Sequence, residues 1–219
     1  MKFLFSSLGK KIQIAFSGLL LCVFLVMHLI NNMALFVGPD VFNAMVGALE
    51  SIKPIIRIME FGLLGILLLH IINALQLTWH NKQASTKQFA PSDAATSTIN
   101  SRTMAITGSV ILVFLIIHLR YLWYTYQAHL FIANETYYDV ILRNELGYLG
   151  HTPTALFYII AIILIGSHLK HGFQSALKTF GVLSHSRWGV LYKISILFWG
   201  IIPGLFILII ISIQIGWIN

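Results

Sequence analysis

The stretch Ser17–Leu29 reads SGLLLCVFLVMHL, and the stretch Thr107–Leu119 repeats its pattern as TGSVILVFLIIHL. Each copy runs from a hydroxyl residue and a glycine through nine mostly apolar residues to a histidine and a leucine. Eleven residues of advance correspond to about three helical turns, so the hydroxyl and the imidazole share one helix face about 16 Å apart. An imidazole at membrane depth needs a partner. Two equivalent imidazoles on two helices therefore indicate one partner shared between them.

The composition excludes an ordinary soluble domain. Of 219 residues, 58% are hydrophobic and 10% are charged, whereas charged residues make up about 25% of a typical soluble domain. The net charge of +7 would suit a nucleic-acid partner, but the positive residues lie in short segments between apolar stretches, which is the pattern of membrane topology. We therefore expect an integral membrane protein that contacts lipid and no nucleic acid. The single Cys22 excludes an internal disulfide and is expected to be a small core residue.

Five apolar stretches are long enough to cross a bilayer, for which about 20 residues suffice. They cover residues 12–36, 55–79, 103–126, 153–173 and 191–217. These stretches predict an all-α protein, one domain over residues 1–219 built as a bundle of five transmembrane helices. The first stretch follows two lysines like a signal peptide, but it exceeds the apolar core of cleaved signals, so we expect it to be retained. Pro203-Gly204 predicts a kink in the fifth helix.

The positive charges give the predicted helices an orientation. With the N-terminus inside, ten of the fourteen Lys and Arg residues fall on the inner side and four on the outer side, while six of the seven acids are outer. Lysine and arginine accumulate in cytoplasmic loops, so we expect a cytoplasmic N-terminus and an external C-terminus. The inner residues are Lys2, Lys10, Lys11, Lys82, Lys87, Arg102, Lys170, Lys178, Arg187 and Lys193, and the outer ones are Lys53, Arg57, Arg120 and Arg143.

Each of the first four predicted helices carries one histidine within its span. At about 1.5 Å per residue, His28 and His118 lie about 24 Å from the inner face, whereas His70 and His168, on helices that return inward, lie near that face. A lone membrane histidine is commonly a hydrogen-bonded packing residue, but four of them in two depth-matched pairs favour shared metal ligation. A pair of imidazoles suits the iron of a b-type haem, whereas zinc usually takes four ligands or keeps an open position. We therefore expect two b haems, with His28 and His118 as ligands of the outer iron and His70 and His168 as ligands of the inner iron.

The hydroxyl–glycine pairs of the repeat leave two interpretations open. Ser17, Gly18, Thr107 and Gly108 lie about 16 Å below the histidines of their own helices, which is the depth of the other histidine pair. A missing side chain there gives a porphyrin room to approach the backbone, so we expect these residues to bind a haem. Small residues also mark close helix contacts in membranes, and the two interpretations are compatible.

One set of residues, taken in order, also matches a known family. By order, spacing and depth over all five spans, the chain resembles the di-haem cytochrome b558-type membrane subunit of succinate:quinone oxidoreductases and quinol:fumarate reductases. The spacing His-x-x-x-Gly resembles the haem-ligand helix of such subunits and favours His168 over His171 as the ligand. The residues that carry the resemblance are Ser17-Gly18, His28, Arg57, Glu60, His70, Ser101, Thr107-Gly108, His118 and the stretch His168–Phe173, which reads HLKHGF.

The resemblance implies a function. Such subunits anchor a flavoprotein and an iron–sulfur protein in the bacterial cytoplasmic membrane and pass electrons between them and menaquinone, so the chain alone would not act on succinate or fumarate. Residues 80–102 and 174–190 would then face the cytoplasm and dock the iron–sulfur subunit. The family uses an outer carboxylate in quinone chemistry, a role that would fall to Glu50, although an ordinary solvated loop acid is the alternative. Some fumarate reductases carry a membrane-embedded glutamate two residues before the fourth ligand, where this chain has Gly166, so a compensating proton path is not expected.

Two other functions stay open at this point. The cytochrome b of another respiratory complex also binds two haems, but the bc-type subunit takes two ligands from each of two helices, whereas four helices supply one each here. A transporter or proton channel would use the histidines as a relay, but a relay spaces its groups continuously through the bilayer. Lys170, His171 and Lys178 would either pair with inner haem propionates or simply follow the charge asymmetry of the topology.

Overall fold

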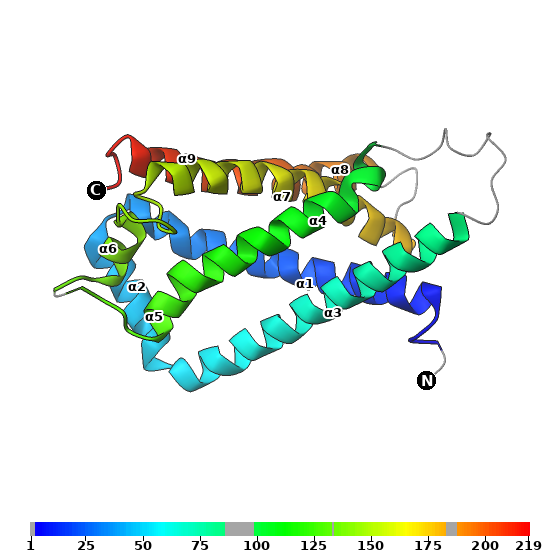
Figure 1. Ribbon diagram of the computed structural model, residues 1–219, viewed down its shortest axis with the longest axis horizontal. Helices are drawn as coiled ribbons and strands as arrows, with labels where there is room; N and C mark the ends of the chain where they lie inside the picture. The colour runs from blue at the N-terminus through cyan, green and yellow to red at the C-terminus, as the bar shows by residue number, and fades with distance from the viewer. Residues whose placement is uncertain (1–2, 86–98, 133, 183–187) are drawn as a thin grey trace.

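The computed structural model describes residues 3–85, 99–132, 134–182 and 188–219, and within these ranges every regular element is a helix. Five helical segments are long and apolar enough to cross a membrane, so the chain is a multi-pass membrane protein. They run side by side, with the N- and C-termini at opposite ends of the bundle (Figure 1). The five expected spans are confirmed, with ends that shift by less than two helical turns. The spans are Ser7–Phe36, Lys53–His80, Thr103–Gln127, Thr152–Thr179 and Gly189–Gln214.

Several spans consist of more than one element. The third span joins an α-helix, a π-helical stretch and a short α-helix, and the fifth joins two α-helices through a second π-helical stretch. In chain order the described elements are α1 (Ser7–Met33), η1 (Ala34–Phe36), α2 (Pro39–Ser51), α3 (Lys53–Ser85), α4 (Ile99–His118), η3 (Leu119–Trp123), α5 (Tyr124–Gln127), α6 (Tyr137–Leu142), α7 (Thr152–Thr179), α8 (Trp188–Ile196), η4 (Leu197–Ile201) and α9 (Ile202–Gln214).

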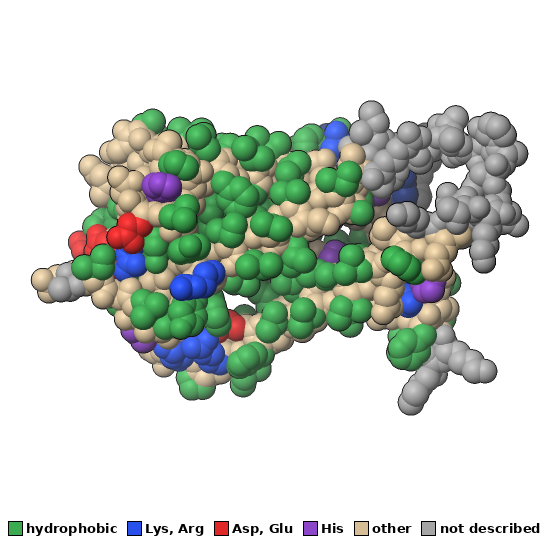
Figure 2. Space-filling view, viewed as in Figure 1, with side chains coloured by type: hydrophobic (Ala, Val, Ile, Leu, Met, Phe, Trp, Pro, Cys, Tyr) green, Lys and Arg blue, Asp and Glu red, His purple; other side chains and the backbone are tan. Residues whose placement is uncertain are grey.

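Helix α7 is central to the bundle and α3 is peripheral. α7 packs against α1, α4 and the α8–α9 span, and its buried face includes the small residues Ala155, Ala161 and Gly166, which let helix backbones approach closely. α3 packs mainly along α1, and the most apolar window of α3 contains no buried residue. Figure 2 shows an opening between α3 and the rest of the bundle, with hydrophobic side chains over the middle of the molecule. The peripheral position of one of the four histidine-bearing helices was not predicted from the sequence.

Helix α1 begins at Ser7, five residues before the predicted apolar stretch. The Ser6 hydroxyl caps it by accepting a hydrogen bond from the Gly9 N–H at 3.1 Å, which satisfies one of the free N–H groups at a helix start. Cys22 is buried in α1, so its expected place in the core is confirmed.

Gly38 opens α2, a helix that the sequence interpretation missed. Gly38 has a φ of +124°, a left-handed conformation that favours glycine. Pro39 then occupies the first turn of α2, where its missing N–H costs nothing. α2 packs on α6. The Asn43 side-chain oxygen on α2 accepts a hydrogen bond from the Tyr138 N–H on α6 at 3.0 Å. The signal for α2 was present in Gly38-Pro39-Asp40, which is typical of a helix start as well as of a turn.

The irregularity expected at Pro203-Gly204 occurs just before the proline, as the π-helical η4. Proline has no N–H to give the carbonyl four residues earlier, here Trp199. That carbonyl lies against α7, where an added Cβ at Gly166 would come within 2.9 Å of the Trp199 oxygen. Gly166 is therefore required by close backbone packing. Any larger residue at this position, a glutamate included, would require the fifth span to shift.

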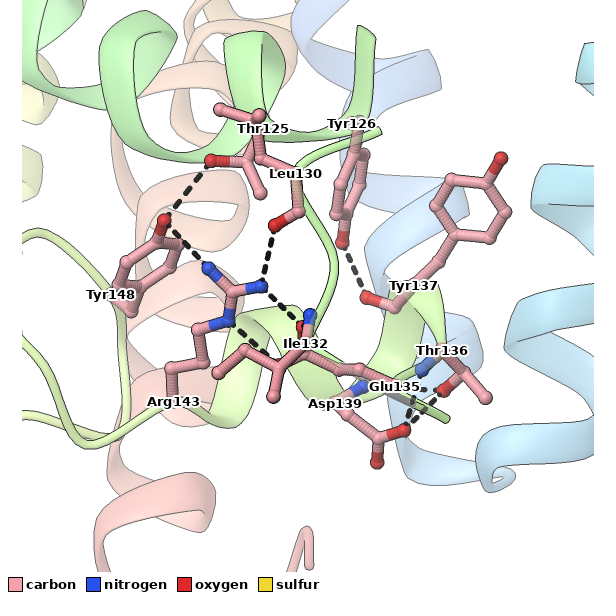
Figure 3. A network of polar contacts seen from close by, with 10 residues as sticks. All are labelled: Thr125, Tyr126, Leu130, Ile132, Glu135, Thr136, Tyr137, Asp139, Arg143 and Tyr148. Atoms are coloured by element: carbon pink, nitrogen blue, oxygen red, sulfur yellow. Dashed lines mark hydrogen bonds and ion pairs between the residues drawn. The ribbon is translucent and has the colours of Figure 1, made fainter. Parts of the chain in front are cut away.

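A polar network holds the connection between α5 and α7 at the C-terminal end of the bundle (Figure 3). The Arg143 guanidinium donates to the Leu130 carbonyl at 2.8 Å and to the Tyr148 hydroxyl at 3.0 Å, and it forms a bidentate ion pair with Glu135. The side chains of Arg143 and Glu135 are only 10% and 9% exposed. Hydrogen bonds from Arg143 hold the pKa of the Glu135 carboxyl below its ordinary value.

Part of the expected docking surface lies outside the described residues. Residues 86–98, within the predicted cytoplasmic segment 80–102, and residues 183–187, within the segment 174–190, are not described. The prediction that these segments dock an iron–sulfur protein stays a prediction.

Glu135→Gln should destabilise the protein by about 2–3 kcal/mol, because it leaves a largely buried guanidinium without its counter-charge. Since the pKa of Glu135 is lowered in the folded protein, the stabilisation is present above the ordinary Glu pKa of about 4.3 and is lost as the pH falls through the lower folded value. Thermal unfolding in detergent at a series of pH values measures it. Glu145→Gln, at an exposed acid of the same connection, is the control. Equal stability of the two variants near neutral pH would contradict the prediction.

Candidate functional site

Two of the four membrane histidines meet near the C-terminal end of the bundle. His28 on α1 and His118 on α4 have ring centroids 5.7 Å apart and planes at 87°. The two residues come from equivalent positions of the internal repeat, and α4 gives way to the π-helical η3 directly after His118. The structure thus brings together the first pair that depth along the helices predicted.

Aromatic side chains surround the His28/His118 pair. Phe24 stacks on His28 at 5.4 Å, and Phe114 and Tyr158 lie 5.6 and 6.0 Å from His118 between ring centroids. Nδ1 of His118 and the Tyr158 hydroxyl are both buried and have no hydrogen-bond partner among the described residues. Buried polar atoms are normally satisfied, so orphaned ones in a native site call for a missing partner. Such a site fits the binding of a polar cofactor between the two rings.

The second pair lies nearer the N-terminal end and is held by the other ends of the repeats. His70 on α3 approaches Ser17 on α1, with 3.1 Å between Nδ1 and Oγ. His168 on α7 approaches Thr107 on α4, with 3.2 Å between Nδ1 and Oγ1. Each helix of the repeat therefore supplies a histidine to the His28/His118 pair and a hydroxyl that contacts a ring of the other pair, His70 and His168.

The hydroxyl of Ser17 fixes the tautomer of His70. Ser17 donates its single proton to the Gln13 carbonyl oxygen, because two oxygens 2.6 Å apart need a hydrogen between them. The Ser17 oxygen can then only accept a hydrogen bond from the imidazole, so His70 donates from Nδ1–H. A neutral imidazole protonated at Nδ1 carries an unshared electron pair on Nε2, which is the form that binds a metal.

Thr107 acts on His168 in the same way. The Thr107 hydroxyl donates to the Met104 carbonyl oxygen at 3.1 Å and accepts from His168 Nδ1. The hydrogen bond to the second ring nitrogen of a metal-binding histidine commonly sets its orientation and raises its basicity. His28 differs, because its nearest side-chain partner, Asn32 Nδ2, is 3.5 Å from Nδ1, a distance too long to orient the ring firmly.

The glycines of the repeat leave room for these imidazole rings to pack directly against the helix backbone. A Cβ added to Gly18 would lie 3.3 Å from Cε1 of His70, and one added to Gly108 would lie 3.5 Å from Cε1 of His168. Of the two open interpretations, the close helix contact is therefore present in the structure. The approach of a porphyrin to Ser17, Gly18, Thr107 and Gly108 stays a prediction.

Glu50 on α2 and Glu60 on α3 differ in their further contacts. Glu50, the predicted quinone residue, forms an ion pair with Lys53 at 2.8 Å, and the two side chains are 27% and 34% exposed. Glu60 on α3 instead reaches the end of the third span. Its Oε1 accepts hydrogen bonds from Trp123 Nε1 at 2.9 Å and Gln127 Nε2 at 3.3 Å.

Glu60 is a candidate that the residue-by-residue interpretation missed, although it was part of the family resemblance. Its Oε2 pairs with Arg57 at 2.9 Å, and Trp123 lies five residues beyond His118, about 7.5 Å along the helix. Ionisable groups inside membrane spans mark functional pathways. The signal in the sequence was an Arg-x-x-Glu pair inside a span, facing an aromatic helix end.

Lys170 lies on a different face of α7 from His168. Lys170 is two residues from His168, which rotates it by about 200° to the opposite face of α7, and its Nζ lies 4.8 Å from the centroid of the Trp199 ring. Lys170 therefore points away from the paired histidines. A role for Lys170 beside a haem propionate is not supported by this geometry.

The geometry allows two separate two-ligand sites. Among the described residues, no group of three or more His, Cys, Asp or Glu side chains gathers as a metal-binding cluster, so each level offers two imidazole donors. No protein-family model, curated protein or solved structure matches this chain.

Proposed function

We propose that this chain is the membrane anchor and electron-transfer subunit of a succinate:quinone oxidoreductase of the bacterial cytoplasmic membrane. His70 and His168 would hold one b haem near the cytoplasmic side, and His28 and His118 a second near the outer side. A flavoprotein subunit and an iron–sulfur subunit would bind on the side of the N-terminus, where ten of fourteen Lys and Arg residues were expected. Menaquinone would exchange electrons with the chain near the outer pair.

The observation that carries the proposal is the pairing of imidazoles across four helices together with the tautomer of one pair. Ser17 and Thr107 orient His70 and His168 with Nε2 unprotonated, which is the state in which a histidine binds iron. Each haem, when bound, would accept and release one electron.

The surroundings of the outer pair suit a redox group rather than a proton wire. Phe24, Phe114 and Phe206 pack against His28 and His118, and a low-dielectric, water-poor shell of this kind tunes a redox centre. The relay alternative would need polar groups at intermediate depths of the helices. The apolar residues between Ser17 and His28, and between Ser109 and His118, offer no such path along either repeat.

Glu60 supports quinone chemistry better than Glu50 does. Quinone reduction takes up two protons, and a carboxyl group near the ring can pass them on one at a time. Both acids are ion-paired and about one-quarter exposed, but Glu60 also accepts hydrogen bonds from Trp123 and Gln127 across the opening between α3 and the third span. We therefore assign the quinone-linked proton exchange to Glu60 and retain Glu50 as the weaker alternative.

A pyridine haemochrome assay on the purified complex should give two b haems per chain, because two imidazole pairs are available. One haem per chain, or none, would overturn the proposal. Co-purification of a subunit with covalently bound flavin separates the succinate-linked complex from another respiratory cytochrome b.

Loss of one histidine should be local to its own pair. His118→Ala should lower the haem content to about one per chain and leave the remaining low-spin spectrum intact, as should His28→Ala. His168→Ala and His70→Ala should share the complementary spectral change. His80→Ala, at an exposed residue of α3, should retain both haems. The pairing would be wrong if His118→Ala and His70→Ala removed the same spectral component.

Glu60→Gln should reduce menaquinone-analogue reduction by about a hundredfold, the typical contribution of a positioned proton donor. Haem content and dye reduction by the flavoprotein should stay unchanged, because Gln can still accept from Trp123. Glu50→Gln is the matched comparison, and its effect should be much smaller. The reverse order of the two variants would restore Glu50 as the quinone residue.

A further inference from the structure

A groove lies on the membrane surface between α7 and the fifth span, on the side of α7 opposite the histidines. Its volume is about 400 Å³, and its walls include Gly166, Ser167 and Lys170 on α7 and Trp199, Gly200 and Gly204 on the fifth span. Figure 1 shows α7 running alongside α8 and α9, and the groove follows this seam. Neither the paired histidines nor Glu60 contributes to it.

The groove follows from the backbone of the fifth span. The π-helical η4 widens the helix next to Pro203, and two glycines flank this irregularity without side chains. An added Cβ at Gly204 would meet no atom within 4 Å, and one at Gly200 would meet nothing closer than 3.6 Å. The space beside these glycines is therefore open and not filled by neighbouring side chains.

One end of the groove carries an uncompensated positive charge. Lys170 is partly buried, and none of the described carboxylates lies within ion-pair distance of it. Its ammonium group lies over the Trp199 ring, whose indole N–H has no hydrogen-bond partner within the described part of the chain. Ser167 adds a hydroxyl to the same wall. This end offers the Lys170 ammonium group and the Ser167 hydroxyl, and its lining contains no acid.

The other end of the groove is apolar and lies deeper in the membrane. Ile163 and Ile207 line it, seven residues before Lys170 and eight after Trp199, which places them about 10–12 Å further along the helices. Lys170 follows Pro153 by 17 residues, about 26 Å along a helix that crosses a core of about 30 Å. The ammonium group therefore lies close to the headgroup level of one leaflet, which its flexible side chain can reach.

We propose that this groove binds an anionic phospholipid of the leaflet on the N-terminal side of the bundle. The phosphate would bind at Lys170 and Ser167, and the first part of an acyl chain would lie against Gly200, Gly204 and Ile207. A net negative headgroup is favoured over a zwitterionic one because Lys170 has no counter-charge in the described structure. The site is independent of haem binding and does not rest on the proposed function.

The test uses the full chain, purified with whatever subunits accompany it, in vesicles of phosphatidylethanolamine and phosphatidylglycerol. In separate samples, one lipid carries a photoactivatable group on its acyl chain, and mass spectrometry locates the labelled peptides. Phosphatidylglycerol should label residues 163–170 and 199–207 about fivefold more than phosphatidylethanolamine, the effect of one lysine near an anionic lipid. Equal labelling by the two lipids would overturn the proposal.

Two variants separate the charge from the groove. Lys170→Gln should reduce the ratio of phosphatidylglycerol labelling to phosphatidylethanolamine labelling toward one. Because both labels are measured on the same protein preparation, this ratio does not depend on the yield of the variant. Gly204→Leu should abolish labelling by both lipids by filling the groove. Lys178→Gln, at another lysine of α7, and Gly62→Leu, at a glycine with open space on α3, should leave the wild-type pattern.

Two results would assign the groove to another occupant and overturn the lipid site. Displacement of the label by a soluble menaquinone analogue would indicate a quinone site. Cross-links between two copies of the chain through residues 163–170 would indicate a helix contact. A normal haem content in a protein that fails the lipid test would leave the proposed electron-transfer function unaffected.

Discussion

A polar side chain inside a bilayer needs a partner within the protein, because the hydrocarbon offers none. In this chain the hydrogen bonds from His70 to Ser17 and from His168 to Thr107 meet that requirement. They join α3 to α1 and α7 to α4, so the histidines are fixed by the same contacts that pair the helices. The position of each ring, the identity of its protonated nitrogen and the need for glycine beside it all follow from this constraint.

The internal repeat makes the two levels interdependent. α1 and α4 each carry one histidine of the His28/His118 pair. Each also carries a hydroxyl–glycine pair that contacts a histidine of the His70/His168 pair. A shift of either helix would therefore move both sites. The levels are not alike, since the His70/His168 rings are held by hydrogen bonds, whereas His118 has a buried nitrogen without a described partner and packs among aromatic rings. Different surroundings of this kind would give two redox groups different potentials.

One backbone feature of the fifth span has effects on two sides of α7. Pro203 cannot donate a hydrogen bond, and the Trp199 carbonyl lies against Gly166. This contact excludes a side chain from position 166, two residues before His168, and the accompanying π-helix and glycines open the groove beside Lys170. The glycine at position 166 and the groove beside Lys170 thus have a common cause.

The sequence by itself determined the five spans and the depth pairing of His28 with His118 and of His70 with His168, because apolar length and a fixed rise per residue set depth in a bilayer. It also indicated that Ser17 and Thr107 lie at the level of the opposite pair. The tertiary structure alone decided that those hydroxyls select a tautomer, that Lys170 faces away from the histidines, and that Glu60 reaches Trp123 on another span. These three features depend on the rotation of each helix about its axis and on which helices are neighbours. Side-chain packing sets the rotation and the neighbours, whereas the length of an apolar stretch carries no information about them.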